Sequence, residues 1–150
     1  MKRHAFTMIE LIFVIVILGI LAAVAIPKLS ATRDDARVAR GAMDIAAALN
    51  DMGAYYTSKG HFTYDASTMT NVDLVQNGGG AGNIPPNGTE RWDYVISNEN
   101  CIDMNATGDG NISIINGASS ASICQGIQKA IDHLITSSPH PYGGDRANWD

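Results

Sequence analysis

Residues 6–27 read FTMIELIFVIVILGILAAVAIP, and this stretch decides what kind of protein the chain is. Residues 11–26 carry no charged side chain. A helix over residues 6–26 is about 30 Å long at a rise of about 1.5 Å per residue, which matches the hydrocarbon core of a bilayer. Lys2 and Arg3 precede it. By the positive-inside rule we expect a single span with its N-terminus in the cytoplasm.

One carboxylate, that of Glu10, lies near the start of this apolar stretch. A charged side chain in a spanning segment is costly, so Glu10 is a candidate functional residue whose partner should be identified. Two alternatives give it no special role. In the first alternative, its side chain reaches the cytoplasmic headgroups near Lys2 or Arg3. In the second, the stretch is a conventional signal peptide cut after the small residues 23–25. Composition alone leaves anchor and signal peptide open.

The local sequence resembles the start of type IV pilins and type II secretion pseudopilins. The matching residues are Ala5-Phe6-Thr7-Met8-Ile9-Glu10-Leu11 and Ile20-Leu21-Ala22-Ala23-Val24-Ala25-Ile26-Pro27. The resemblance implies that a prepilin peptidase cuts between Ala5 and Phe6 and methylates the new amine. Ala5 stands where most members of the family have glycine. Both residues are small, so we expect processing to survive.

The resemblance also implies roles in assembly for two further residues. In the filaments of this family, the residue matching Glu10 neutralises the N-terminal amine of a neighbouring subunit. Opposite charges attract strongly in a low dielectric, whereas either charge alone is costly to bury. Pro27 matches a proline at which the helix bends or unwinds on assembly, and proline removes one helical hydrogen-bond donor.

Beyond Pro27 the apolar pattern becomes one-sided. Apolar side chains recur three or four residues apart at Val38, Ala42, Ile45, Leu49, Met52 and Tyr56. This spacing is typical of an amphipathic helix, and Gly60 is a plausible stop. The sequence therefore predicts one helix over residues 6–58, about 80 Å long. A helix of that length suits a filament subunit.

The remaining residues predict a small α+β domain. The strongest candidate strands are residues 92–97 and 111–116, and the weaker ones are residues 61–64 and 73–75. Residues 76–87 are expected to form a loop, residues 120–136 a helix, and residues 139–150 an irregular tail. We therefore predict a leader (1–5), a long N-terminal helix (6–58) and an extracytoplasmic globular domain (59–150). The fold class is α+β, with the long helix packed on a small antiparallel sheet beside a short C-terminal helix.

The charge and the motifs argue against a nucleic-acid binder and an enzyme. Beyond Gly60, three basic residues face ten acidic ones, whereas duplex DNA is bound through clustered lysine and arginine. The glycines at residues 78–82 lack the spacing of a phosphate-binding loop. His61, His133 and His140 have no second ligand at metal-binding spacing. We expect no catalytic residue and no direct nucleic-acid binding.

Cys101 and Cys124 are the two cysteines of the chain. A pair in an extracytoplasmic domain usually forms a disulfide, which would stabilise this domain by about 3 kcal/mol in the chain-entropy model. Type IV pilins commonly close their C-terminal region this way, so the pairing fits the resemblance. The alternative is two buried free thiols.

Two short sequences between the cysteines suggest modification or metal binding. Asp103-x-Asn105-x-Thr107 and Asp109-x-Asn111-x-Ser113 resemble the bacterial N-glycosylation sequon, with Asn105 and Asn111 as acceptors. The oxygens of Asp103, Asn105, Thr107 and Asp109 also alternate as in a calcium loop, but the bidentate glutamate of an EF-hand is missing. These residues are common in ordinary turns. We expect no cofactor, with calcium as the alternative.

The sequence thus predicts a structural subunit of a type IV pilus-like or type II secretion pseudopilus filament. Its expected partners are other pilins or pseudopilins, prepilin peptidase and an inner-membrane assembly platform. Three roles of such a filament stay open: adhesion or motility, DNA uptake, and secretion. The alternative of another class is a soluble secreted binding domain with a conventional signal peptide. A mature N-terminus at Phe6 indicates the filament subunit, and one at Ile26 the secreted domain.

Overall fold

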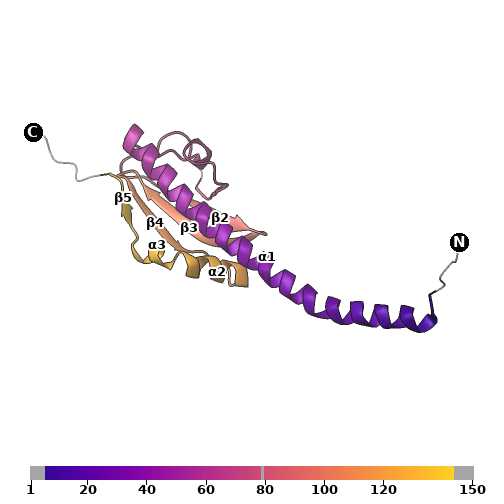
Figure 1. Cartoon of the computed structure of the whole chain (residues 1–150). Helices are drawn as coiled ribbons and strands as arrows, with labels where there is room; N and C mark the ends of the chain where they lie inside the picture. Colours follow the sequence, from indigo (N-terminus) through magenta and orange to yellow (C-terminus); the bar gives the residue numbers. More distant parts are fainter. Residues whose placement is uncertain (1–5, 79, 144–150) are drawn as a thin grey trace, which may run out of the picture. The chain divides into compact units, whose positions relative to one another are not determined.

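The computed structural model describes residues 6–78 and 80–143, except for the side chains of Pro27, Ser30 and Ala31. The chain divides into two units, Met1–Ala36 and Arg37–Asp150. A single helix, α1 (Met8–Lys59), contributes to both units (Figure 1). The predicted helix over residues 6–58 is therefore confirmed to within two residues at its start and one at its end.

Helix α1 ends where the sequence predicted a stop. The Gly60 N–H donates to the Tyr56 carbonyl oxygen at 2.7 Å, and Gly60 has a φ of +76°. This left-handed conformation costs little for glycine because it lacks a Cβ atom. The chain can therefore leave the helix without leaving that carbonyl unpaired.

The second unit is built around a five-stranded antiparallel sheet of order β1-β2-β3-β4-β5. The strands are β1 (Val75–Gln76), β2 (Thr89–Ile96), β3 (Glu99–Thr107), β4 (Asn111–Asn116) and β5 (His140–Pro141). A short 3-10 helix, η1 (Ala66–Thr68), lies in the connection between α1 and β1. Because every neighbouring pair is consecutive in sequence, the sheet is a meander that needs no crossover connection.

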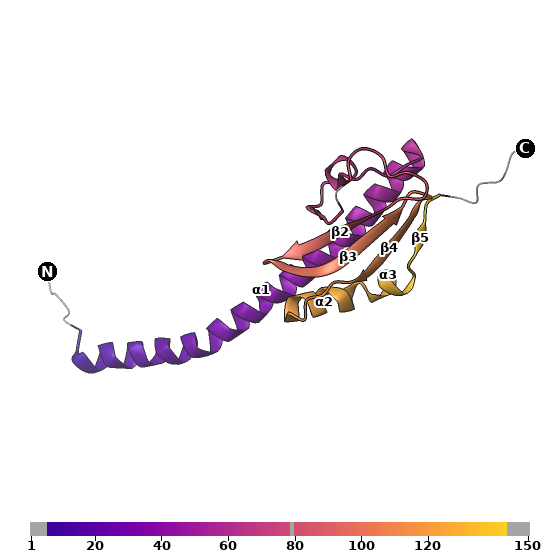
Figure 2. The same cartoon turned by 180° about the vertical axis from the view of Figure 1, so that it is seen from behind.

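Residues 37–59 of α1 lie across one face of this sheet (Figure 1), and the opposite face is seen in Figure 2. The helix buries the apolar stripe predicted from its spacing, including Ile45 and Met52. Trp92 and Tyr94 of β2 are buried in the same core. Tyr94 donates to the Asp44 carboxylate of α1 at 2.8 Å, and burial together with this contact raises the pKa of Tyr94.

Two short helices complete this unit, α2 (Ser122–Ala130) and α3 (Asp132–Thr136). They replace the single predicted helix over residues 120–136, which is interrupted at Ile131. Glycine allows α1 and α2 to approach closely, since a Cβ atom on Gly126 would lie 2.7 Å from a methyl group of Val38. The apolar side of α2 contributes Ile127 to the core.

The α+β fold class is confirmed, and several strand predictions need correction. Strand β4 has the predicted bounds of residues 111–116, whereas β2 begins three residues earlier than predicted and ends at Ile96. Residues 61–64 form no strand, and Thr63 makes only an isolated bridge to Asn83. In the predicted irregular tail, β5 pairs with β4 at residues 140 and 141. This pairing depends on a neighbour distant in sequence, which local residue preferences do not reveal.

Strand β3 was missed entirely because its polar residues resemble turn residues. Asp103, Asn105 and Thr107 alternate with Ile102, Met104 and Ala106, which are fully buried. This period of two is the pattern of a strand with one face on the core. The polar residues lie on the other face of the sheet. The backbone of β3 pairs with β2 along one edge and with β4 along the other.

Substituting Gly108→Ala tests the packing at the turn that follows β3. A Cβ atom on Gly108 would lie 1.8 Å from the Pro85 carbonyl oxygen, so backbone must move to admit it. We expect a loss of about 1–3 kcal/mol in the free energy of unfolding, measured by denaturant titration in detergent. Gly60→Asn is the control, because that position is open and asparagine tolerates positive φ. Equal stability of the two variants would contradict this packing.

Candidate functional site

The apolar N-terminal part of α1 is the most conspicuous feature of the first unit. Met8–Ile26 is long and apolar enough to cross a membrane, by length and composition. Its large apolar side chains are all exposed, from 41% at Ile17 to 81% at Met8. Since exposing such a surface to water is unfavourable, this segment requires lipid or other protein around it.

Glu10 takes part in a capping box at the start of α1. The Thr7 backbone N–H and hydroxyl both donate to the Glu10 carboxylate at 2.8 Å. In return, the Glu10 N–H donates to the Thr7 hydroxyl at 3.4 Å. These reciprocal bonds satisfy backbone donors that the first turn of a helix otherwise leaves unpaired. Thr7 therefore has a defined role that the sequence analysis missed, although the Thr-x-x-Glu pattern before an apolar run could have revealed it.

The other residues predicted at this end of the chain lie in different surroundings. Ala5, before the expected cleavage point, is outside the described residues. Phe6 precedes α1, and its side chain is 83% exposed. At Pro27 the backbone is helical and α1 continues through it. The structure therefore brings Thr7 and Glu10 together at the helix start, while Pro27 lies about five turns further along.

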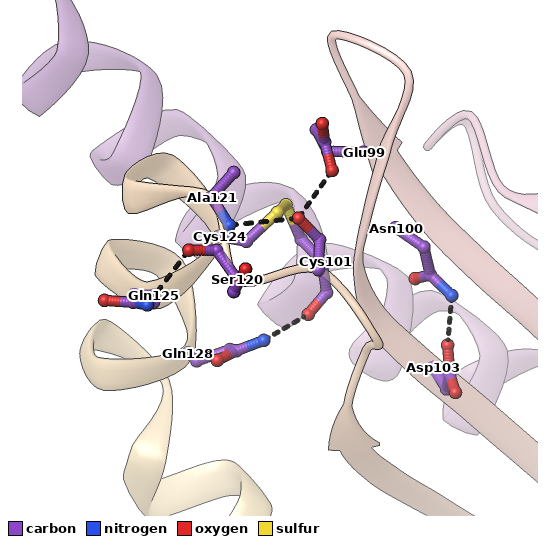
Figure 3. The surroundings of a disulfide bond; sticks show 10 residues. Glu99, Asn100, Cys101, Asp103, Ser120, Ala121, Cys124, Gln125 and Gln128 are labelled. Atoms are coloured by element: carbon purple, nitrogen blue, oxygen red, sulfur yellow. Dashed lines mark hydrogen bonds between the residues drawn. A yellow bond between two sulfur atoms is a disulfide. The ribbon is translucent and has the colours of Figure 1, made fainter.

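Cys101 and Cys124 form the predicted disulfide in the second unit (Figure 3). Cys101 lies in β3 and Cys124 in α2, their Cα atoms are 4.6 Å apart, and both residues are fully buried. The bond joins positions that are 23 residues apart in sequence. It therefore joins α2 to β3, the middle strand of the sheet.

Hydrogen bonds around the disulfide connect the same two elements. The Gln128 side chain of α2 donates to the Cys101 carbonyl oxygen at 3.0 Å (Figure 3). Ser119, just before α2, donates to the exposed Glu99 carboxylate at 2.6 Å. These bonds reinforce the attachment of α2, and of the residues just before it, to β3.

The four residues proposed as calcium ligands do not converge on one point. Asp103, Asn105 and Thr107 lie along β3, where four residues span about 13 Å, and Asp109 follows in the turn. Calcium ligands lie about 2.3–2.6 Å from the ion, so Asp103 and Thr107 cannot share one. Asp103 instead accepts from Asn100 at 2.7 Å and pairs with Arg91 at 3.8 Å. Among residues 6–78 and 80–143, no group of three or more His, Cys, Asp or Glu side chains is placed to hold a metal.

The two asparagines proposed as glycosylation acceptors differ in position. Asn105 is half-buried in the middle of β3, between β2 and β4. Asn111 begins β4, and its amide donates to the Asp109 carboxylate at 3.0 Å. The Thr107 hydroxyl also donates to Asp109, and these bonds lower the pKa of Asp109. Glycosylation of either asparagine stays a prediction.

The comparison with known families agrees with the N-terminal geometry. Residues 1–26 match the prokaryotic N-terminal methylation motif, which is the prepilin-type signal of type IV pilins and pseudopilins. No curated protein and no solved structure matches the chain at a significant level. The chain therefore carries the prepilin-type signal on an apolar helix. Together these features support a membrane-anchored protein with a prepilin-type N-terminus.

Removal of the disulfide should destabilise the second unit. In a Cys101→Ala, Cys124→Ala double variant we expect a loss of about 2–5 kcal/mol, because the unfolded chain regains the freedom of the closed loop. Thermal unfolding of the full-length protein in detergent, with and without reductant, measures the loss. Reductant should leave the double variant unchanged. Equal melting of oxidised and reduced native protein would contradict a stabilising disulfide.

Proposed function

We propose that this chain is a structural subunit of a type IV pilus-like or type II secretion pseudopilus filament. In this proposal prepilin peptidase processes the precursor, and an inner-membrane assembly platform adds the subunit to a filament of other pilins or pseudopilins. The observation that carries the proposal is the prepilin-type signal at residues 1–26, which continues into an exposed apolar helix. Such a signal supports a structural role, and we assign no reaction to the chain.

The exposed surface of Met8–Ile26 supports a role in assembly. While this helix is in the bilayer, lipid covers its side chains. Drawing it out of the bilayer into water would be strongly unfavourable, since apolar burial stabilises by roughly 25 cal/mol per Å². Extraction must therefore be coupled to packing against the same segment of other subunits. A bundle of such helices forms the centre of the proposed filament.

The contacts of Glu10 suggest how its charge is accommodated at each stage. Before assembly, Thr7 supplies two hydrogen bonds to the carboxylate from the same chain. In the filament, the methylated amine of Phe6 from a neighbouring subunit is the proposed partner. Since this amine is positive, it adds an attraction that the neutral Thr7 donors do not provide. The pairing thus favours the assembled state and sets the register between subunits.

The proposed location is the inner membrane, with a single span and a cytoplasmic N-terminus. Lys2 and Arg3 support this orientation through the positive-inside rule, because they lie directly before the span. The second unit then lies on the periplasmic side, where its disulfide can form. After assembly it belongs to a periplasmic or cell-surface filament.

Processing at Ala5–Phe6 is the first test of this proposal. Mass spectrometry of protein from a host with prepilin peptidase should show an N-terminal N-methylphenylalanine at Phe6. A host lacking the peptidase should yield the unprocessed chain, because in this proposal the segment is not a substrate of ordinary signal peptidase. A mature N-terminus at Ile26 would instead identify a secreted domain released from a conventional signal peptide.

Substituting Glu10→Ala tests the proposed pairing with the neighbouring amine. We expect normal membrane insertion and processing, because an apolar side chain suits the span, but at least tenfold fewer filaments. Electron microscopy and cross-linking of membrane fractions measure assembly, and N-terminal sequencing confirms processing. Asp73→Ala is the matched control, since it removes an exposed carboxylate from the second unit. Normal filament numbers in Glu10→Ala would contradict the pairing.

A further inference from the structure

Two aspartates lie directly opposite each other on the face of the sheet away from α1. Asp93 of β2 is the register partner of Asp103 of β3. Each side chain is only 11% exposed. Like charges at opposite positions of neighbouring strands are destabilising, and burial increases this cost. The pair therefore needs compensation from its surroundings.

One cation serves both carboxylates. Arg91 Nε lies 3.2 Å from Asp93 Oδ1, and Arg91 Nη1 lies 3.8 Å from Asp103 Oδ2. With both aspartates ionised, the described groups of this cluster carry two negative charges and one positive charge. One negative charge is left without a matching cation.

The other described residues that contact the pair are uncharged. Asn77, which follows β1, donates to Asp93, and Asn100 donates to Asp103 at 2.7 Å. The strand partners on the outer sides are Val75 of β1, opposite Asp93, and Ile115 of β4, opposite Asp103. The buried Glu90 of β2 lies an odd number of residues from Asp93, so strand alternation directs it to the other face. None of these neighbours supplies the missing positive charge.

One oxygen of the pair has no hydrogen-bond donor in the described part of the chain. Asp93 Oδ1 is buried and accepts no hydrogen bond among the described residues, although it is ion-paired with Arg91. Burial, followed by the charge of Asp103, raises the pKa of Asp93, and the strand register places the two residues opposite each other. A hydrogen bond between two carboxyl groups requires one of them to be protonated.

We propose that Asp93 and Asp103 hold one proton between them and make this face of the sheet sensitive to pH. With the proton present, the cluster is neutral and the two carboxyl groups attract. Without it, they repel across the β2–β3 pairing. A domain outside the cytoplasm experiences the pH of its surroundings, so such a pair would alter stability in response to it.

The direction of the effect follows from proton linkage. The folded state holds the proton more tightly than the unfolded chain, in which an aspartate has its ordinary pKa of about 3.9. The stability that this proton contributes is fully present below that pKa and is lost as pH rises through the folded-state value. Asp109 shows the opposite behaviour, because its pKa is lowered and its contribution is lost as pH falls.

Carbon-13 NMR of the aspartate carboxyl groups in the full-length protein tests the proposal directly. Between pH 3 and 8 in detergent micelles, we expect Asp93 and Asp103 to titrate together, with one step above the range of an exposed aspartate. Asp73, which is exposed, is the internal reference. Independent titration of both residues within the ordinary range would overturn the proposal.

Thermal unfolding of variants gives the second measurement. Asp93→Asn and Asp103→Asn each remove the uncompensated charge and leave the other carboxylate paired with Arg91. For each variant we compare the change in melting temperature, relative to the native protein, at two pH values. We expect this change to be about 4–8 °C more positive at pH 7–8 than at pH 4. Asp73→Asn is the matched control and should show no such difference. The proposal would be overturned if the melting temperatures of both variants depended on pH as that of the native protein does. If a variant fails to fold, the NMR titration of the native protein decides.

Discussion

The rest of this structure depends on the need to cover one apolar surface. Among the residues that the structure describes, the side chains of Met8–Ile26 are exposed throughout. Water cannot be their normal surroundings, because the unfavourable free energy grows with the apolar area exposed. Either lipid or other protein must cover them. In our proposal, assembly replaces the lipid around these side chains with the helices of other subunits.

A single polar position makes that exchange specific. An apolar helix can slide or rotate against another with little change in energy, whereas a carboxylate in the same surface must meet a donor or a cation. Glu10 finds donors in Thr7 of its own chain, so these bonds compensate its charge in part without a partner subunit. A charged amine from a neighbour competes with those donors. The same residue thus serves the isolated subunit and, in our proposal, the filament.

The second unit is organised by the two faces of its sheet. On one face, α1 and the buried side chains of β2 and β3 form the core, and the disulfide ties α2 to β3. The other face carries Asp93, Asp103 and Arg91, where charges rather than apolar contacts decide the local stability. Because these residues alternate along the same strands as the core residues, a change on one face acts on the pairing that supports the other.

The span, the long helix and the α+β class were predictable from the sequence, because apolar length and helical spacing are local properties of the chain. The disulfide followed from having two cysteines in a domain that we expect to lie outside the cytoplasm. Strand β3 and its Asp93–Asp103 pairing were not predictable in practice, since Asp103 and Asn105 are typical of turns. Only the neighbouring strands place those residues on a sheet face and set which carboxylates meet. The tertiary structure decided this because side-chain charge acts through distance in space, which the order of residues along the chain does not specify.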